Sequence, residues 1–74
     1  MSDLLKKYYE IMDDYKSGKY GEDDLYLDEV LEAAGEPDLF DRMSIDDIKT
    51  LRDSASGFAK MAFTEALKAK GFNG

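Results

Sequence analysis

The chain contains neither cysteine nor histidine. Without cysteine it has no disulfide, no thiolate nucleophile, and no ligand for a zinc–thiolate or iron–sulfur site. Without histidine it lacks the usual general base near neutral pH and the commonest metal ligand. Its serines therefore have no imidazole to activate them. We expect a protein that is not an enzyme, with no catalytic residue, cofactor or metal site.

Long uncharged runs are also missing. The longest lies between Asp53 and Lys60, which is far too short to span a bilayer. The first residues do not combine a basic stretch with the apolar run of a secretory signal. We therefore expect a soluble, cytoplasmic protein that does not contact membranes.

The 74 residues suffice for one small domain, predicted to cover residues 1–74. A net charge of −7 alone would favour disorder. However, 43% of the residues are hydrophobic and 12% are aromatic, and the apolar positions are periodic. A folded domain is the better interpretation.

Helical spacing of apolar residues predicts a first helix over residues 2–16, with Ser2 or Asp3 as its cap. Residues 17–21 contain two glycines and predict a break. A second helix is predicted from Asp23 or Asp24 to residue 34, and Gly35 is expected to end it.

A short helical turn is predicted over residues 38–43, after Pro37. Ser44, with Asp47 three residues later, resembles a capping box that begins the longest element, which extends to residue 70. Residues 54–57 are rich in serine and glycine, so that element is expected to bend or break there.

We thus expect an all-α fold: a small bundle of three main helices plus a short helical turn, with the long C-terminal helix as its core. The predicted core residues are Leu5, Tyr8, Ile11, Met12, Leu27, Val30, Leu31, Phe40, Ile48, Leu51, Phe58, Ala62 and Leu67.

Negative charge is concentrated in one part of the chain. Residues 22–47 contain eleven acidic residues against Arg42 alone, a net charge of −10, whereas residues 1–21 are neutral and residues 48–74 carry +3. Such a concentration repels itself. One interpretation is a face that only improves solubility, with acids that cap helices.

The sharper interpretation is a face that docks on a basic surface of a partner macromolecule, to which its charge steers it. Tyrosine is favoured at interfaces. The predicted partner-binding residues are Tyr20, Glu22, Asp23, Asp24, Tyr26, Asp28, Glu29, Glu32, Glu36, Asp38 and Asp41.

Direct binding of nucleic acid is disfavoured, because the few basic residues are spread along the C-terminal segment. The inverse is expected: an acidic face that mimics nucleic acid and occupies the basic groove of a nucleic-acid-binding protein. In size and charge the chain is similar to small acidic proteins of phages and mobile elements that act as inhibitors in this way.

Two alternatives remain open. The first is a structural or assembly protein that forms homodimers through helix–helix contacts, along the alanine seam of residues 55–69. The second is a degenerate calcium-binding helix–loop–helix over residues 13–24, although Tyr15 stands where a carboxylate or amide is expected.

Overall fold

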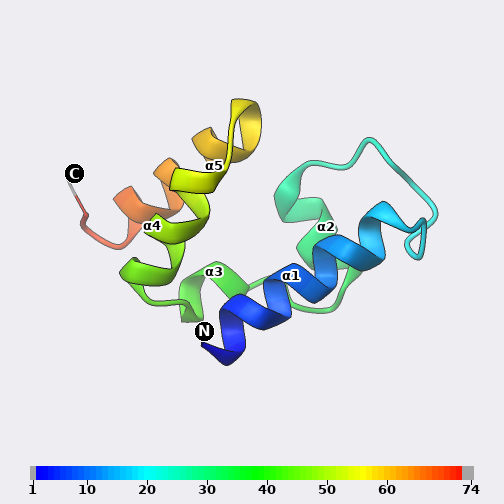
Figure 1. Cartoon of the computed structure of the whole chain (residues 1–74), viewed down its shortest axis with the longest axis horizontal. Coiled ribbons are helices and arrows are strands. Elements are labelled where there is room, and N and C mark those ends of the chain that lie inside the picture. The colour runs from blue at the N-terminus through cyan, green and yellow to red at the C-terminus, as the bar shows by residue number, and fades with distance from the viewer. Residues whose placement is uncertain (1, 73–74) are drawn as a thin grey trace. The chain divides into compact units, whose positions relative to one another are not determined.

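The structure is a computed structural model that describes residues 2–72, and within them it contains helices and no strand. The all-α prediction is confirmed. The helices are α1 (Asp3–Lys16), α2 (Leu27–Ala33), α3 (Leu39–Arg42), α4 (Ile45–Ser54) and α5 (Gly57–Ala69) (Figure 1).

The chain divides into two compact units, an N-terminal unit of residues 1–39 and a C-terminal unit of residues 40–74. In the N-terminal unit α2 packs against α1, and in the C-terminal unit α5 packs against α4. The boundary falls within α3, directly after Leu39. That residues 1–74 form a single domain stays a prediction.

Helix α1 follows the sequence prediction closely. The Ser2 hydroxyl accepts a hydrogen bond from the backbone N–H of Leu5 at 3.1 Å and so caps the helix. Leu5, Tyr8 and Ile11 form its buried stripe. After Lys16 the chain turns at Gly18, whose φ of 87° is costly for residues with a side chain.

Helix α2 begins later than predicted. It starts at Leu27, so the prediction of a helix from Asp23 or Asp24 is wrong. The backbone N–H of Leu25 donates instead to the Tyr15 hydroxyl, and that of Tyr26 to Glu29 Oε1. The Glu29 carboxylate thereby caps the helix at Tyr26, whose extended backbone marks the start of α2.

The end of α2 agrees with the prediction. Gly35 has a φ of 78°, and the N–H of Glu36 donates to the carbonyl of Leu31 at 2.9 Å. The N–H of Gly35 donates to the carbonyl of Glu32 at 3.0 Å. These two bonds define a Schellman motif, which turns the chain away from the helix axis.

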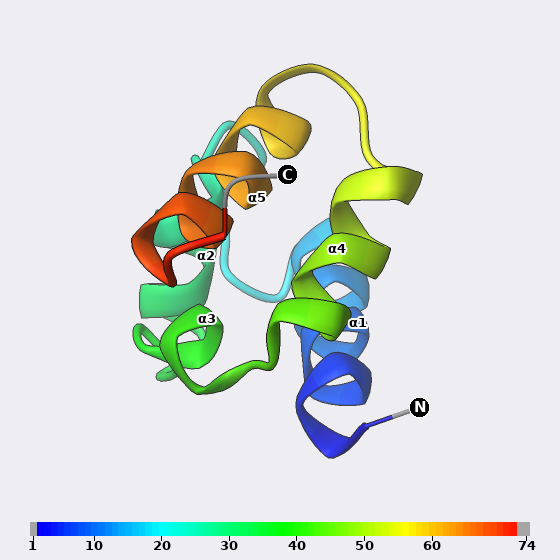
Figure 2. The same ribbon diagram turned by 90° about the vertical axis from the view of Figure 1, so that its left-hand side faces the viewer.

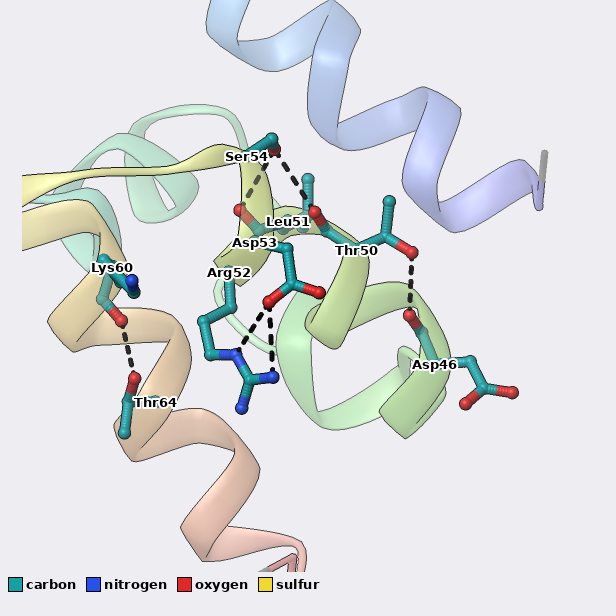
Figure 3. A network of polar contacts seen from close by, with 8 residues as sticks. All are labelled: Asp46, Thr50, Leu51, Arg52, Asp53, Ser54, Lys60 and Thr64. Atoms are coloured by element: carbon teal, nitrogen blue, oxygen red, sulfur yellow. Dashed lines mark hydrogen bonds and ion pairs between the residues drawn. The ribbon is translucent and has the colours of Figure 1, made fainter. Parts of the chain in front are cut away.

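The long C-terminal element is two helices, because the chain breaks at the predicted weak point. Figure 3 shows the hydroxyl of Ser54 donating to the carbonyls of Thr50 and Leu51, both at 3.2 Å. Such back-bonding competes with the helical ladder, and Ala55 then adopts an extended backbone. Helices α4 and α5 consequently lie side by side in opposite directions (Figure 2).

Most of the predicted core is buried: Leu5, Tyr8, Ile11, Val30, Leu31, Ile48, Leu51 and Leu67. Met12, Leu27, Phe40 and Ala62 are only partly buried. Phe58 was predicted wrongly, since its side chain is 82% exposed. The break at residues 55–56 resets the helical phase, so the apolar stripe does not continue through Phe58.

The structure also adds core residues that were not predicted. Leu39, Met43 and Phe63 are almost fully buried. Phe63 meets Phe40 edge to face, with ring centroids 5.4 Å apart. This aromatic pair ties the short helix α3 to α5 within the C-terminal unit.

Candidate partner-binding site

The predicted site begins in an exposed loop of residues 21–26, here called the acidic loop. The side chains of Glu22, Asp23 and Asp24 are exposed, and none of them forms an ion pair or a hydrogen bond with the described residues. The loop is tied to α1 by the bond between the Leu25 N–H and the Tyr15 hydroxyl, at 3.0 Å. Three adjacent carboxylates are thereby held on the surface of the N-terminal unit.

The exposed face of α2 continues this charge. Asp28, Glu29 and Glu32 are exposed, while Val30 and Leu31 are buried on the opposite side. We call Asp28, Glu29 and Glu32 the α2 acidic face. It follows the acidic loop directly, so both belong to the N-terminal unit.

Local helix chemistry explains only part of the α2 acidic face. Asp28 and Glu29 lie in the first turn, where negative charge suits the helix dipole, and Glu29 Oε1 accepts from the N–H of Tyr26 at 3.1 Å. Glu32 lies in the last turn, where the dipole disfavours it, and Asp28 is four residues away with the same charge. Glu32 therefore weakens the helix that holds it.

The remaining predicted acids have different surroundings. Glu36 is half-buried, and its Oε1 accepts from Lys7 Nζ at 3.0 Å. Asp38 is exposed just before α3. Asp41 lies in the C-terminal unit, where its backbone carbonyl accepts from Lys70 Nζ at 2.8 Å. The structure thus gathers all the predicted binding residues except Asp41 in the N-terminal unit.

The two predicted tyrosines differ in exposure. Tyr26, the last residue of the acidic loop, is 70% exposed, so its ring is available for contact. Tyr20 is half-buried. Aromatic rings next to charge are typical of contact surfaces, because they supply apolar area at little cost in side-chain entropy.

The two units differ in net charge. The N-terminal unit has twelve acidic and four basic residues, a net charge of −8. The C-terminal unit has five acidic and six basic residues, a net charge of +1. The negative field of this protein is therefore a property of the N-terminal unit.

Sequence reasoning missed a surface groove of about 320 Å³ in the N-terminal unit. It lies between residues of α1 and the turns that follow α1 and α2. Tyr20 lines it and was the only predicted site residue, besides Glu36, to do so. No local pattern could have located it, because it is formed by segments distant in sequence.

The C-terminal unit has a different exposed feature, the apolar pair Phe58 and Met61 on the first turns of α5. Phe58 is 82% and Met61 is 63% exposed. The alanine seam is divided, since Ala59, Ala62 and Ala66 are partly covered while Ala69 is exposed. The side of α5 that carries Phe63 and Leu67 is the buried one.

The described residues offer no group of three or more Asp or Glu side chains placed to hold a metal ion. In the segment considered for calcium, the Asp14 carboxylate pairs with Lys19 Nζ at 3.4 Å and the Tyr15 hydroxyl binds the Leu25 N–H. Within residues 2–72, none of the helices has the length and apolar character needed to cross a membrane.

Comparison of the chain with known protein families, curated proteins and solved structures found no match.

Proposed function

We propose that this protein is a non-enzymatic binding protein whose acidic loop and α2 acidic face dock on a basic surface of a partner macromolecule. Tyr26 supplies apolar contact area in the middle of this surface. The partner's lysines and arginines meet carboxylates that are already exposed and that form no ion pair with residues 2–72, so docking does not require such pairs to break.

The observation that carries the proposal is Glu32. It is exposed in the last turn of α2, where both the helix dipole and the repulsion from Asp28 act against it. A surface that served only solubility could carry the same charge at positions that do not oppose the helix dipole. A docking surface gains a third carboxylate beside Asp28 and Glu29.

The most specific form of the proposal is an inhibitor that mimics nucleic acid and occupies a basic groove. A protein that binds phosphates does so with clustered lysine and arginine, and its affinity falls steeply with salt. A dense row of exposed carboxylates presents the same sign of charge to such a groove. The partner class that fits best is a nucleic-acid-binding protein.

The test is affinity capture of the partner from the native host at about 50 mM and about 500 mM salt, followed by identification of the eluted proteins. The captured partner is then challenged with duplex DNA or RNA. We expect capture at low salt only, and we expect nucleic acid to displace the partner. Capture that is equal at both salt concentrations would contradict electrostatic docking, and lack of competition would contradict the mimic.

A second candidate is self-assembly through α5, which the exposure of Phe58 and Met61 favours. If assembly is the function, sedimentation will show a dimer at micromolar concentration, and Phe58→Ser with Met61→Ser will shift it to monomer. The dimer will survive high salt, since its contact is apolar. A monomer under all these conditions would eliminate this candidate.

A further inference from the structure

The surface groove in the N-terminal unit is lined by both apolar and charged residues. Ile11 from α1 and Ala33 and Ala34 from the end of α2 supply the apolar part. The volume of about 320 Å³ lies at the lower end of the range of small-molecule sites. The groove is large enough for one long side chain or a small ligand, and too small for a folded element of a partner.

The residues that line the groove include three carboxylates and two lysines, an excess of one negative charge. Lys7 Nζ donates to Glu36 Oε1 at 3.0 Å, and Lys19 Nζ lies 3.4 Å from Asp14 Oδ2. The fifth charged residue, Glu10, forms no ion pair or hydrogen bond with the described residues. A single incoming cation would balance the charge of the groove.

An anion is the poorer fit. Both lysines of the groove already have carboxylate partners, and the N-terminal unit carries a net charge of −8 that repels anions. A compact ammonium ion would use the carboxylates but not the apolar lining residues. A guanidinium on an aliphatic stem uses both, because it pairs with carboxylates, stacks on aromatic rings such as that of Tyr20, and lays its methylenes on apolar surface.

We propose that this groove is a socket for one arginine side chain of the basic partner. The proposal rests on the proposed function and adds to it a defined point of contact beside the acidic surface. Glu10 pairs with the guanidinium, Tyr20 stacks on it, and the stem lies on Ile11 and Ala33. One bound arginine fixes the orientation of the partner, which the exposed carboxylates alone do not do.

The test uses the full chain and a defined probe, N-acetyl-arginine methylamide, followed through the amide signals in NMR spectra. N-acetyl-citrulline methylamide has nearly the same shape without the charge, and inorganic phosphate tests the anion alternative. We expect saturable shifts at Ile11, Ala33 and Ala34 with the arginine probe, at a dissociation constant on the order of 1 mM. Citrulline is expected to bind at least about tenfold more weakly, and phosphate not to shift these signals.

Two pairs of matched variants locate the site. Ala33→Leu enlarges a side chain that lines the groove and is expected to weaken binding at least about tenfold, while Ala69→Leu, at an exposed position of α5, leaves it unchanged. Glu10→Gln is expected to weaken binding about two- to fivefold, and Glu32→Gln, which removes the same charge outside the groove, is expected to weaken it less. Glu10 is exposed, so the second pair remains informative if Ala33→Leu disturbs α2.

The proposal would be overturned if the arginine probe shifted amide signals throughout the acidic loop and Ala33→Leu did not change its binding. Equal binding of the citrulline probe, or preferential binding of phosphate, would also overturn it. Different results would contradict the arginine-binding groove and the docking function. If the captured partner responds to salt but not to Ala33→Leu, docking stands and the socket is wrong. If the probe binds as expected but no partner is captured in a salt-dependent way, the socket stands and the docking function is wrong.

Discussion

The hydroxyl of Tyr15 accepts a hydrogen bond from the backbone N–H of Leu25 at 3.0 Å, across ten positions of sequence. This bond joins the last turn of α1 to the segment that leads into α2. It ties the end of the acidic loop, at Leu25, to α1. Glu22, Asp23 and Asp24 lie in that loop, before the start of α2 at Leu27.

Replacing Tyr15 with Phe removes this hydroxyl and leaves the ring in place. We predict a loss of about 1 kcal/mol in the free energy of unfolding, the usual net value of one such bond. We also predict faster hydrogen exchange at the Leu25 amide. Tyr20→Phe is the control, because the Tyr20 hydroxyl forms no hydrogen bond with the described residues. Equal exchange rates at Leu25 in both variants would show that the Tyr15 bond does not hold the loop.

Neutralising Glu32 tests whether the acidic surface is held against the preference of the fold. Glu32→Gln removes a charge from the last turn of α2, so we predict a gain of about 0.3–1 kcal/mol in the free energy of unfolding at low salt. Asp28→Asn, in the first turn, removes a charge that suits the dipole. We expect it to give a smaller gain or a loss in the same chemical-denaturation measurement. If Glu32→Gln destabilised the protein instead, Glu32 would have a structural role.

Tyr8 makes the stability of the protein depend on alkaline pH. Burial and, second, the neighbouring Tyr9 raise the pKa of Tyr8 from 10.0 to about 12. Between these values the unfolded chain loses the Tyr8 proton while the folded chain keeps it. This contribution to stability is therefore fully present below pH 10 and is lost as the pH rises to about 12.

Unfolding measured from pH 9 to 12.5 checks this contribution. We predict that wild type loses on the order of 2 kcal/mol more than Tyr8→Phe over this interval, since Phe has no proton to lose. Tyr26→Phe, at a ring that is 70% exposed, is expected to behave much like wild type. Identical profiles for wild type and Tyr8→Phe would contradict the assignment.

Two phenylalanines of α5 have opposite roles. Phe63 is 1% exposed and packs on Phe40, so Phe63→Ala is predicted to cost about 3–5 kcal/mol by leaving a cavity. Phe58→Ala, at an exposed position, is predicted to change stability by no more than about 0.5 kcal/mol. Denaturant titration of the two variants compares them directly. Similar losses would show that Phe58 is buried in solution, as by association of two chains.

Local signals predicted the parts of the fold that depend on local interactions. The stripe of Leu5, Tyr8 and Ile11, the cap at Ser44 and the stop at Gly35 are all as expected, because each is set by neighbours at most five positions apart. The weakness near Ser54 was also visible in the sequence. That it becomes a full reversal, with α5 lying back on α4, depends on packing between the two helices.

The errors have different origins. The start of α2 was wrong because Glu29, through its bond to the Tyr26 N–H, caps the helix at Tyr26 rather than at the acidic residues before it. Phe58 was placed in the core because the helix was extended through the break. In the candidate partner-binding site, the high density of carboxylates could be predicted from the sequence. The groove could not, because residues of two helices and two turns form it.

The central claim, docking through the α2 acidic face, is tested most directly by two charge-matched variants and the captured partner. The first is Asp28→Asn, Glu29→Gln and Glu32→Gln; glutamine at 29 keeps an acceptor for the Tyr26 N–H. The second is Asp3→Asn, Asp13→Asn and Glu65→Gln, which removes the same charge from exposed positions on α1 and α5. The measurement is the affinity of each for the partner as a function of salt.

We predict that the first variant binds at least about tenfold more weakly at low salt and shows a clearly smaller salt dependence, while the second stays within about threefold of wild type. Equal affinities for the two variants would contradict the claim, because the overall charge of the chain, rather than the α2 acidic face, would then determine binding.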